Sequence, residues 1–104
     1  KVDCKVAAAA VNLYYITPQG KKVKVDRNYF IQILKYDKII YNSKGYKLSA
    51  SHKAYGKTLI TNVNGFITNK VVFNSKGIDY LVKKYKDDKR IWRAIDGQLY
   101  CEEA

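Results

Sequence analysis

The chain has 104 residues, of which 47% are hydrophobic and 28% are charged, and its formal net charge is +11 at pH 7. This size fits one folded domain spanning residues 1–104, and the hydrophobic content excludes a disordered chain. No apolar run approaches the roughly 20 residues that a membrane-spanning helix needs, so the sequence excludes an integral membrane protein.

The chain begins with a predicted β-hairpin. Residues 5–16 are apolar and end in a strand-like segment, and the motif at 17–20, Thr-Pro-Gln-Gly, is typical of a turn. Residues 21–25 then alternate polar and apolar side chains, as a half-buried strand does. The four alanines at 7–10 leave a second interpretation open, because alanine favours a helix start.

One α-helix is predicted to follow the hairpin. Asp26 is a suitable N-cap, and Phe30, Ile33 and Leu34 recur at helical spacing with charged residues on the other side. We expect a helix of about three turns that packs on a sheet through these apolar side chains.

The rest of the chain reads as strands separated by turns. The turn signals lie at 42–45, 64–65, 74–77, 87–88 and 96–97. The predicted strands span 58–63, 66–73, 78–85, 90–95 and 99–101. Asn64-Gly65 is typical of a type I′ hairpin turn. The predicted fold is therefore an α+β domain with an N-terminal β-hairpin and one α-helix packed on a C-terminal antiparallel β-sheet.

Two cysteines, Cys4 and Cys101, lie near opposite ends of the chain. A disulfide between them would close a loop around nearly the whole protein and would restrict the unfolded state by about 4–5 kcal/mol. Such a bond indicates an oxidising, extracellular compartment. Two separate buried thiols are the alternative. The missing methionine and the lack of a leader segment also lead us to expect a mature secreted product.

The basic charge indicates an anionic partner. Twenty lysines and arginines against nine acidic residues are typical of a nucleic-acid or anionic-surface binder, and ten tyrosines could stack on unpaired bases. Lysine is also a common solubilising residue, and tyrosine is also common in strands, so composition alone does not decide between these interpretations.

In its size, terminal cysteines, early hairpin and single helix, the chain resembles the guanyl-specific fungal ribonucleases and, more closely, the secreted ribonuclease-like effectors of powdery mildew fungi. The C-terminal segments 78–82, 87–89, 91–95 and 100–102 carry most of the likeness, and residues 2–4 resemble the start of the effectors, with Val2 in place of an aromatic residue. The resemblance implies a ribonuclease-like scaffold that has lost its active site.

Catalysis by such a scaffold needs a general base, a general acid and cations around the phosphate. The single histidine, His52, lies in a segment that resembles the His-Lys-Tyr region of the ribonucleases, but residues 70–73 carry no glutamate and Arg93 stands nearest to the expected second histidine. We therefore expect no catalytic residues. We also expect no cofactor and no metal site, because one histidine and two cysteines without a CxxC motif supply no ligand set.

The resemblance therefore implies a secreted, non-catalytic effector that binds host plant proteins, with a nucleotide-binding leucine-rich-repeat immune receptor as one candidate, and that acts either outside or inside the host plant cell. We expect the protein to be a monomer. The alternative is RNA binding without cleavage, and an active ribonuclease is the least favoured function. The candidate binding residues are Tyr46, Lys47, His52, Lys53, Tyr55, Lys57, Lys83, Lys84 and Arg93.

Overall fold

The computed structural model describes residues 1–102, which form an α+β fold. The helices are α1 (Cys4–Ala10), α2 (Arg27–Tyr36), the 3-10 helix η1 (Ala50–Tyr55) and α3 (Ser75–Lys86). The strands are β1 (Val2–Asp3), β2 (Tyr14–Ile16), β3 (Lys22–Lys24), β4 (Ile40–Asn42), β5 (Tyr46–Leu48), β6 (Gly56–Val63), β7 (Phe66–Phe73), β8 (Ile91–Ile95) and β9 (Gln98–Glu102). The predicted α+β class is confirmed, whereas the prediction of a single helix is wrong.

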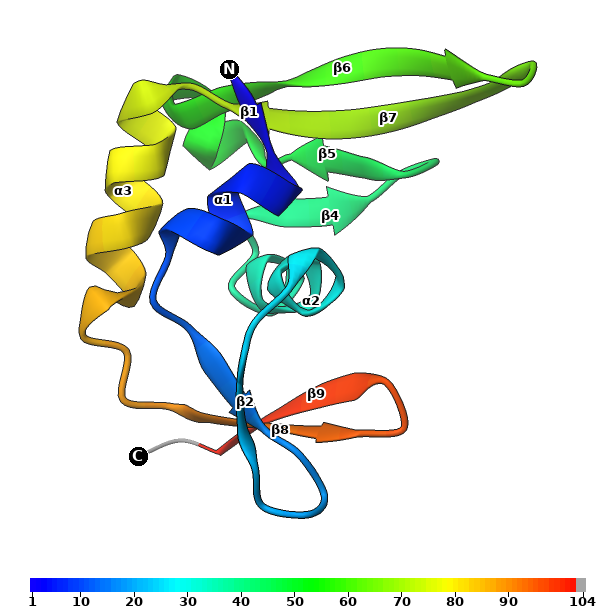
Figure 1. Ribbon diagram of the computed structural model, residues 1–104. Helices are drawn as coiled ribbons and strands as arrows, with labels where there is room; N and C mark the ends of the chain where they lie inside the picture. The colour runs from blue at the N-terminus through cyan, green and yellow to red at the C-terminus, as the bar shows by residue number, and fades with distance from the viewer. Residues whose placement is uncertain (103–104) are drawn as a thin grey trace.

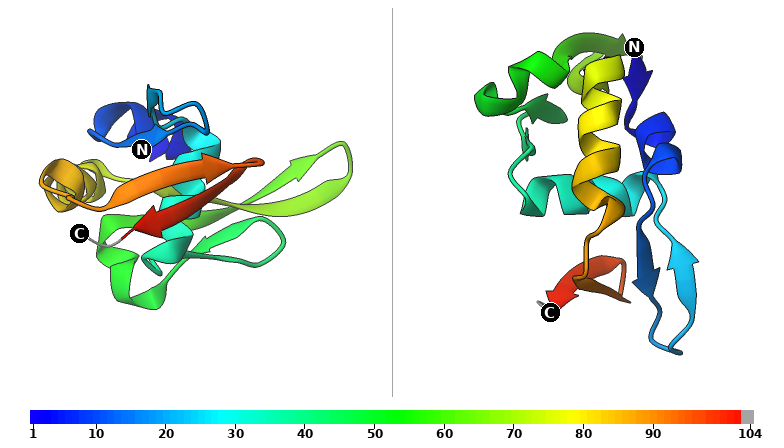
Figure 2. Two further views of the ribbon diagram at one scale, coloured as in Figure 1. Left: turned by 90° about the horizontal axis from the view of Figure 1, so that it is seen from below. Right: turned by 90° about the vertical axis from the view of Figure 1, so that its left-hand side faces the viewer.

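Two separate sheets replace the single C-terminal sheet that the sequence predicts. One has the strand order β1-β7-β6 and the other has the order β3-β2-β8-β9, while β4 and β5 pair only with each other. Helix α2 lies between the two sheets, and α3 runs along one side from the first sheet to the second (Figure 1). The other views show the same separation (Figure 2). The N-terminal hairpin therefore shares a sheet with the last two strands.

Several turn predictions are confirmed. Strands β2 and β3 pair around a turn in which Gly20 has a positive φ and donates a hydrogen bond to the Thr17 carbonyl. Asn64 and Gly65 both have positive φ values, 53° and 82°, as a type I′ turn requires, and they join β6 to β7. Local turn chemistry thus fixes the hairpins.

Helix α2 forms as predicted. The Asp26 carboxylate accepts a hydrogen bond of 3.0 Å from the Tyr29 backbone N–H, which caps the helix start. Phe30, Ile33 and Leu34 are fully buried and lie at the centre of the core. The apolar face predicted from the sequence is therefore the face of α2 that is buried in the core.

The segment predicted as the first strand is partly a helix. Asp3 accepts a hydrogen bond from the Val6 backbone N–H and caps α1, and the alanine run then continues the helix. Ala7 and Ala8 are buried against the rest of the core. The small side chains allow α1 to approach its neighbours closely, and the alternative interpretation of the alanines is the correct one.

The segment predicted as a strand at 78–85 is also helical, because it lies within α3. Asn74 caps this helix by accepting a hydrogen bond of 2.7 Å from the Gly77 backbone N–H. Leu81 and Tyr85, four residues apart, are both buried in the core. Their spacing places them on one face of a helix, so the period of the apolar residues is helical rather than alternating.

No disulfide joins Cys4 to Cys101, which corrects the predicted terminal clasp. Cys4 begins α1 beside the first sheet, whereas Cys101 lies opposite Trp92 in the second sheet. Because α2 lies between these two sheets, the two cysteines belong to different parts of the core (Figure 1). Burial raises the pKa of the Cys4 thiol to about 11, so Cys4 remains a protonated core side chain at neutral pH.

Candidate functional site

The sequence-predicted residues that the fold brings together lie where η1 packs on α3. Asn74 joins these two elements: its side-chain amide donates to the Ala54 carbonyl, and its backbone N–H donates to the Tyr55 carbonyl, both at 3.1 Å. The same side chain caps α3 through Gly77. One asparagine therefore fixes the end of η1 against the first turn of α3.

Gly77 allows this close packing. A Cβ at position 77 would overlap the backbone carbonyl of Tyr55, and backbone atoms have little freedom to move away. The φ angle of Gly77 is not in the left-handed region, so space rather than conformation requires glycine here.

An aromatic cluster covers the junction. The rings of Tyr55 and Tyr80 stack with their centroids 4.2 Å apart and their planes 11° apart. The His52 ring lies 5.7 Å from the Tyr80 ring, and the Lys76 ammonium lies 5.9 Å from the centroid of Tyr55. The cluster thus combines a tyrosine pair, an imidazole and a cation.

Hydroxyl groups surround the imidazole of His52. Its Nδ1 atom lies 2.7 Å from the Ser49 hydroxyl and 3.0 Å from the Ser51 hydroxyl. Its Nε2 atom lies 3.3 Å from the Tyr80 hydroxyl. Burial and the nearby positive charge of Lys84 lower the pKa of His52 below its ordinary value, so the ring is neutral at pH 7. His52 therefore contributes a neutral hydrogen-bonding group.

Exposed lysines border the aromatic cluster. Lys76, Lys83 and Lys84 belong to α3, and they lie four residues before and three and four residues after Tyr80, which places each of them next to Tyr80 on the helix surface. Lys53 is exposed on η1. We call this region the η1–α3 surface, which consists of His52, Lys53, Tyr55, Lys76, Tyr80, Lys83 and Lys84. Its cations and ring faces are suited to a ligand that carries both negative charge and planar groups.

The other predicted binding residues lie elsewhere. Tyr46 and Lys47 belong to β5, where the Tyr46 ring lies 5.8 Å from the Lys35 ammonium. Lys57 is on β6, where hydrogen bonding between its side chain and that of Lys1, together with its like charge, contributes to a lowered pKa of Lys1. Five of the nine candidates, residues 52, 53, 55, 83 and 84, therefore share the η1–α3 surface.

Arg93 is also outside this surface. It lies on β8 in the second sheet, and its guanidinium forms an ion pair of 2.6 Å with the Glu102 carboxylate. Both side chains are about half exposed. The structure thus gives Arg93 an acidic neighbour and does not place it beside His52.

Lys76 and Tyr80 belong to the surface but were missed by the sequence interpretation. Lys76 and Tyr80 can be assigned to the surface only once α3 is known to be a helix. A strand over 78–85 would point alternate side chains to opposite faces, so Tyr80 and Lys83 would lie on opposite sides. The signal was present in the helical spacing of Ile78, Leu81 and Tyr85 behind the Asn74 cap.

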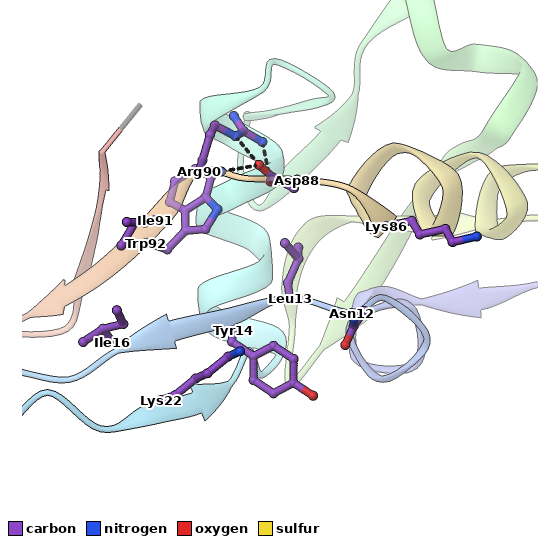
Figure 3. A pocket seen from close by; sticks show the side chains of 10 residues that line it. All are labelled: Asn12, Leu13, Tyr14, Ile16, Lys22, Lys86, Asp88, Arg90, Ile91 and Trp92. Carbon is purple, nitrogen blue, oxygen red and sulfur yellow. Dashed lines mark hydrogen bonds and ion pairs between the residues drawn. The ribbon is translucent and has the colours of Figure 1, made fainter. Parts of the chain in front are cut away.

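A cavity of about 370 Å³ lies at a different place, between the start of β2, strand β3 and the link from α3 to β8 (Figure 3). Lys22 borders it and stacks over the Tyr14 ring at 4.7 Å, and Lys86 borders it from the end of α3. The guanidinium of Arg90 is held by Asp88 on the cavity wall (Figure 3). None of the residues predicted from the sequence lines this cavity.

Comparison with known proteins identifies no relative. No family model, no curated protein and no solved structure matches the chain. Within residues 1–102, no helix is long and apolar enough to cross a membrane, and no group of three or more His, Cys, Asp or Glu side chains could hold a metal ion.

Proposed function

We propose that this protein acts by binding rather than by catalysis, and that its η1–α3 surface binds a polyanion, with single-stranded RNA as the best fit. The observation that carries the proposal is the stacked pair Tyr55–Tyr80 bordered by Lys53, Lys76 and the Lys83–Lys84 pair. Lysines supply attraction to phosphates, and aromatic rings supply stacking surface for unpaired bases.

The chemistry around His52 favours binding over cleavage. Transfer of the 2′-hydroxyl proton and protonation of the leaving oxygen need two groups on opposite sides of the phosphate. His52 is the single histidine of the sequence, and the groups that hold its two nitrogens are the hydroxyls of Ser49, Ser51 and Tyr80. Hydroxyls with ordinary or raised pKa values are poor bases at neutral pH.

The biological role that we propose is that of a secreted effector of a plant pathogen with a ribonuclease-like ancestry. The resemblance of the sequence to the powdery mildew effectors supports this role, together with the small size and the strongly basic charge. In this role the protein binds host components, and a plant immune receptor is one protein that could recognise it.

The proposal is tested by the salt dependence of binding to a fluorescently labelled single-stranded RNA. If all four lysines contact phosphates, log Kd should change with log salt with a slope of about 2.8, which is an affinity loss of roughly 50-fold between 50 and 200 mM salt. The double variant Lys83→Gln/Lys84→Gln should lower this slope by about 1.4. No retention of the RNA at low salt would refute RNA binding.

A matched control is the double variant Lys21→Gln/Lys22→Gln, which removes the same charge from the β2–β3 hairpin. The salt slope should remain that of the unmodified protein, and an equal drop would show that net charge rather than the η1–α3 surface binds RNA. Specific RNA cleavage that disappears in His52→Ala would overturn the non-catalytic assignment.

An experiment in plant tissue distinguishes between RNA and a host protein as the ligand of the effector. If RNA is the ligand, Lys83→Gln/Lys84→Gln should lose both RNA binding and the response of the host tissue. If the variant loses RNA binding but still elicits the full response, the host partner is a protein and RNA is not required.

A further inference from the structure

The β6–β7 hairpin exposes a group of apolar side chains. It extends well beyond the rest of the first sheet, on the side away from α3 (Figure 1). Ile60 and Phe66 are each 77% exposed, Ile67 is 65% exposed and Val63 is 58% exposed. The register of β6 with β7 puts Ile60 and Ile67 on one face of the hairpin and Val63 and Phe66 on the other, so both faces of its projecting end are apolar.

The projecting part of this hairpin, residues 58–69, carries no charge in a chain that is otherwise rich in lysine. Residues 58–69 contain no charged side chain, although 28% of the whole sequence is charged, and the nearest lysines in the sequence are Lys57 and Lys70. Lys44 lies beside the segment on the β7 side, where its carbonyl accepts hydrogen bonds from Thr68 and Asn69. Residues 58–63 of a second copy would bring no like charge against residues 58–63 of the first.

Strand β6 also has an open edge. In the first sheet β6 is the outermost strand, and it pairs with β7 over all eight residues from Gly56 to Val63. Strand β5 contacts it through a side chain, since the Thr58 hydroxyl accepts a hydrogen bond of 3.0 Å from the Leu48 backbone N–H. Edge strands of soluble proteins are commonly protected by a charge, a proline or a bulge. Residues 58–63 contain neither proline nor charge, and their register with β7 is uninterrupted.

From these three observations we infer that the β6 edge binds the β6 edge of a second copy of the chain, to form an antiparallel, two-fold symmetric dimer. A two-fold axis at Ile60 would place Ile60 opposite its own copy, Thr58 opposite Asn62 and Lys57 opposite Val63. No lysine then faces a lysine, and the two hairpins join into one continuous sheet. Self-complementarity of this kind is what a two-fold interface requires.

The charge distribution favours a second copy as the occupant. Two chains of net charge +11 repel each other, but the antiparallel register keeps the two basic bodies apart by the length of β6, and salt screens the remaining repulsion. Dimerisation should therefore strengthen as salt is raised, which is the opposite of the response expected for RNA binding.

Sedimentation equilibrium or light scattering over a wide range of protein concentration tests the dimer. Ile60→Lys places two like charges directly opposite each other at the axis, and it should weaken dimerisation at least about 10-fold. Ile95→Lys is the matched control, because Ile95 is 51% exposed on β8 in the other sheet, and it should dimerise like the unmodified chain. Circular dichroism should show both variants folded.

Cysteine cross-linking tests the register. Directly opposed side chains have Cβ atoms about 4.5–5.5 Å apart, so Ile60→Cys should form an intermolecular disulfide under mild oxidation. Asn62→Cys should not, because its own copy would be displaced by four residues, or about 13 Å. The unmodified protein serves as the control for Cys4 and Cys101.

Three results would overturn the inference. These are a monomer at every concentration and salt, a dimer that survives Ile60→Lys, and cross-linking of Asn62→Cys as efficient as that of Ile60→Cys. Binding of the monomeric protein to neutral lipid vesicles through the hairpin would identify a membrane as the occupant and would also overturn it.

Discussion

The ion-pair network around Arg90 provides a sharp test of what holds this fold together. The Arg90 guanidinium makes two hydrogen bonds of 2.7 and 2.9 Å to Asp37, which follows α2, and two of 2.9 Å to Asp88, which follows α3. The Tyr85 hydroxyl donates a further hydrogen bond of 2.7 Å to Asp37. The network thus ties the ends of two helices to the start of β8.

Removing the cation should leave two carboxylates in a poorly solvated site. The side chains of Asp37 and Asp88 are 10% and 6% exposed, and that of Arg90 is 20% exposed. Breaking a buried ion pair from one side typically costs about 3–5 kcal/mol. We therefore expect Arg90→Met to lower the free energy of unfolding by about 4 kcal/mol, a large fraction of the roughly 5–15 kcal/mol available to a small domain.

Urea unfolding followed by circular dichroism measures this loss, and a thermal scan should show a melting temperature lower by at least about 15 °C. Arg93→Met is the matched control, because it removes the same side chain from a half-exposed pair with Glu102 and should cost at most about 1 kcal/mol. An equal loss in both variants, or a loss below about 1.5 kcal/mol in Arg90→Met, would refute the reasoning.

Two further predictions concern packing and pH. Gly77→Ala adds a methyl group that overlaps the Tyr55 carbonyl, so η1 must shift. The free energy of unfolding should fall by about 1–2 kcal/mol, and NMR spectra should show changed ring shifts for the stacked Tyr55 and Tyr80. Equal or greater stability with unchanged ring shifts would contradict this prediction. Burial alone would raise the pKa of Asp37, but hydrogen bonds from Arg90 and Tyr85 outweigh burial and lower it. The contribution of Asp37 to stability is therefore present above its ordinary pKa of about 3.9 and is lost as the pH falls below it. In Arg90→Met the effect of burial dominates and raises the pKa of Asp37 above its ordinary value. The difference in free energy of unfolding between the unmodified protein and Arg90→Met should therefore narrow as the pH falls from 7 to 5. A difference that does not change with pH in urea unfolding would contradict this prediction.

The hairpins and α2 could be predicted from sequence because their signals are local. Asn64-Gly65 supplies the positive φ angles of its turn, and Asp26 caps the helix that follows it. Helix α3 was missed because the segment begins with Ser75 and Lys76 before Gly77, which resembles a turn. The reason for that glycine is the Tyr55 backbone, 22 residues earlier in the chain, and no local pattern contains this information.

The candidate site was likewise predictable only where its residues are close together in the sequence. His52 and Tyr55 were found because they are close in sequence, whereas Tyr80 became part of the site only through the packing of α3 on η1. The resemblance put Arg93 nearest to the expected second histidine, and the structure places Arg93 on β8 in the second sheet, away from His52. The predicted disulfide failed for the same reason, since Cys4 begins α1 beside the first sheet and Cys101 lies on β9 in the second sheet.

The two proposed surfaces occupy different ends of one structural unit, because η1 leads directly into β6 and the hairpin extends away from α3 (Figure 1). A dimer formed through the β6 edges would therefore hold the two η1–α3 surfaces at opposite ends of a joined sheet, each beside the tip of the other copy's hairpin, because the register that pairs Lys57 with Val63 brings that tip to the start of β6. Once a long RNA is bound to one of the two surfaces of a dimer, the second surface is held at a high effective concentration near the same RNA, so the dimer binds more tightly without any new contact. Salt acts on the two interactions in opposite directions, since it screens the repulsion between basic chains and competes with lysine for phosphate. Charged side chains are absent from residues 58–69 and dense on α3, and this uneven distribution is what separates self-association from ligand binding in a protein of net charge +11.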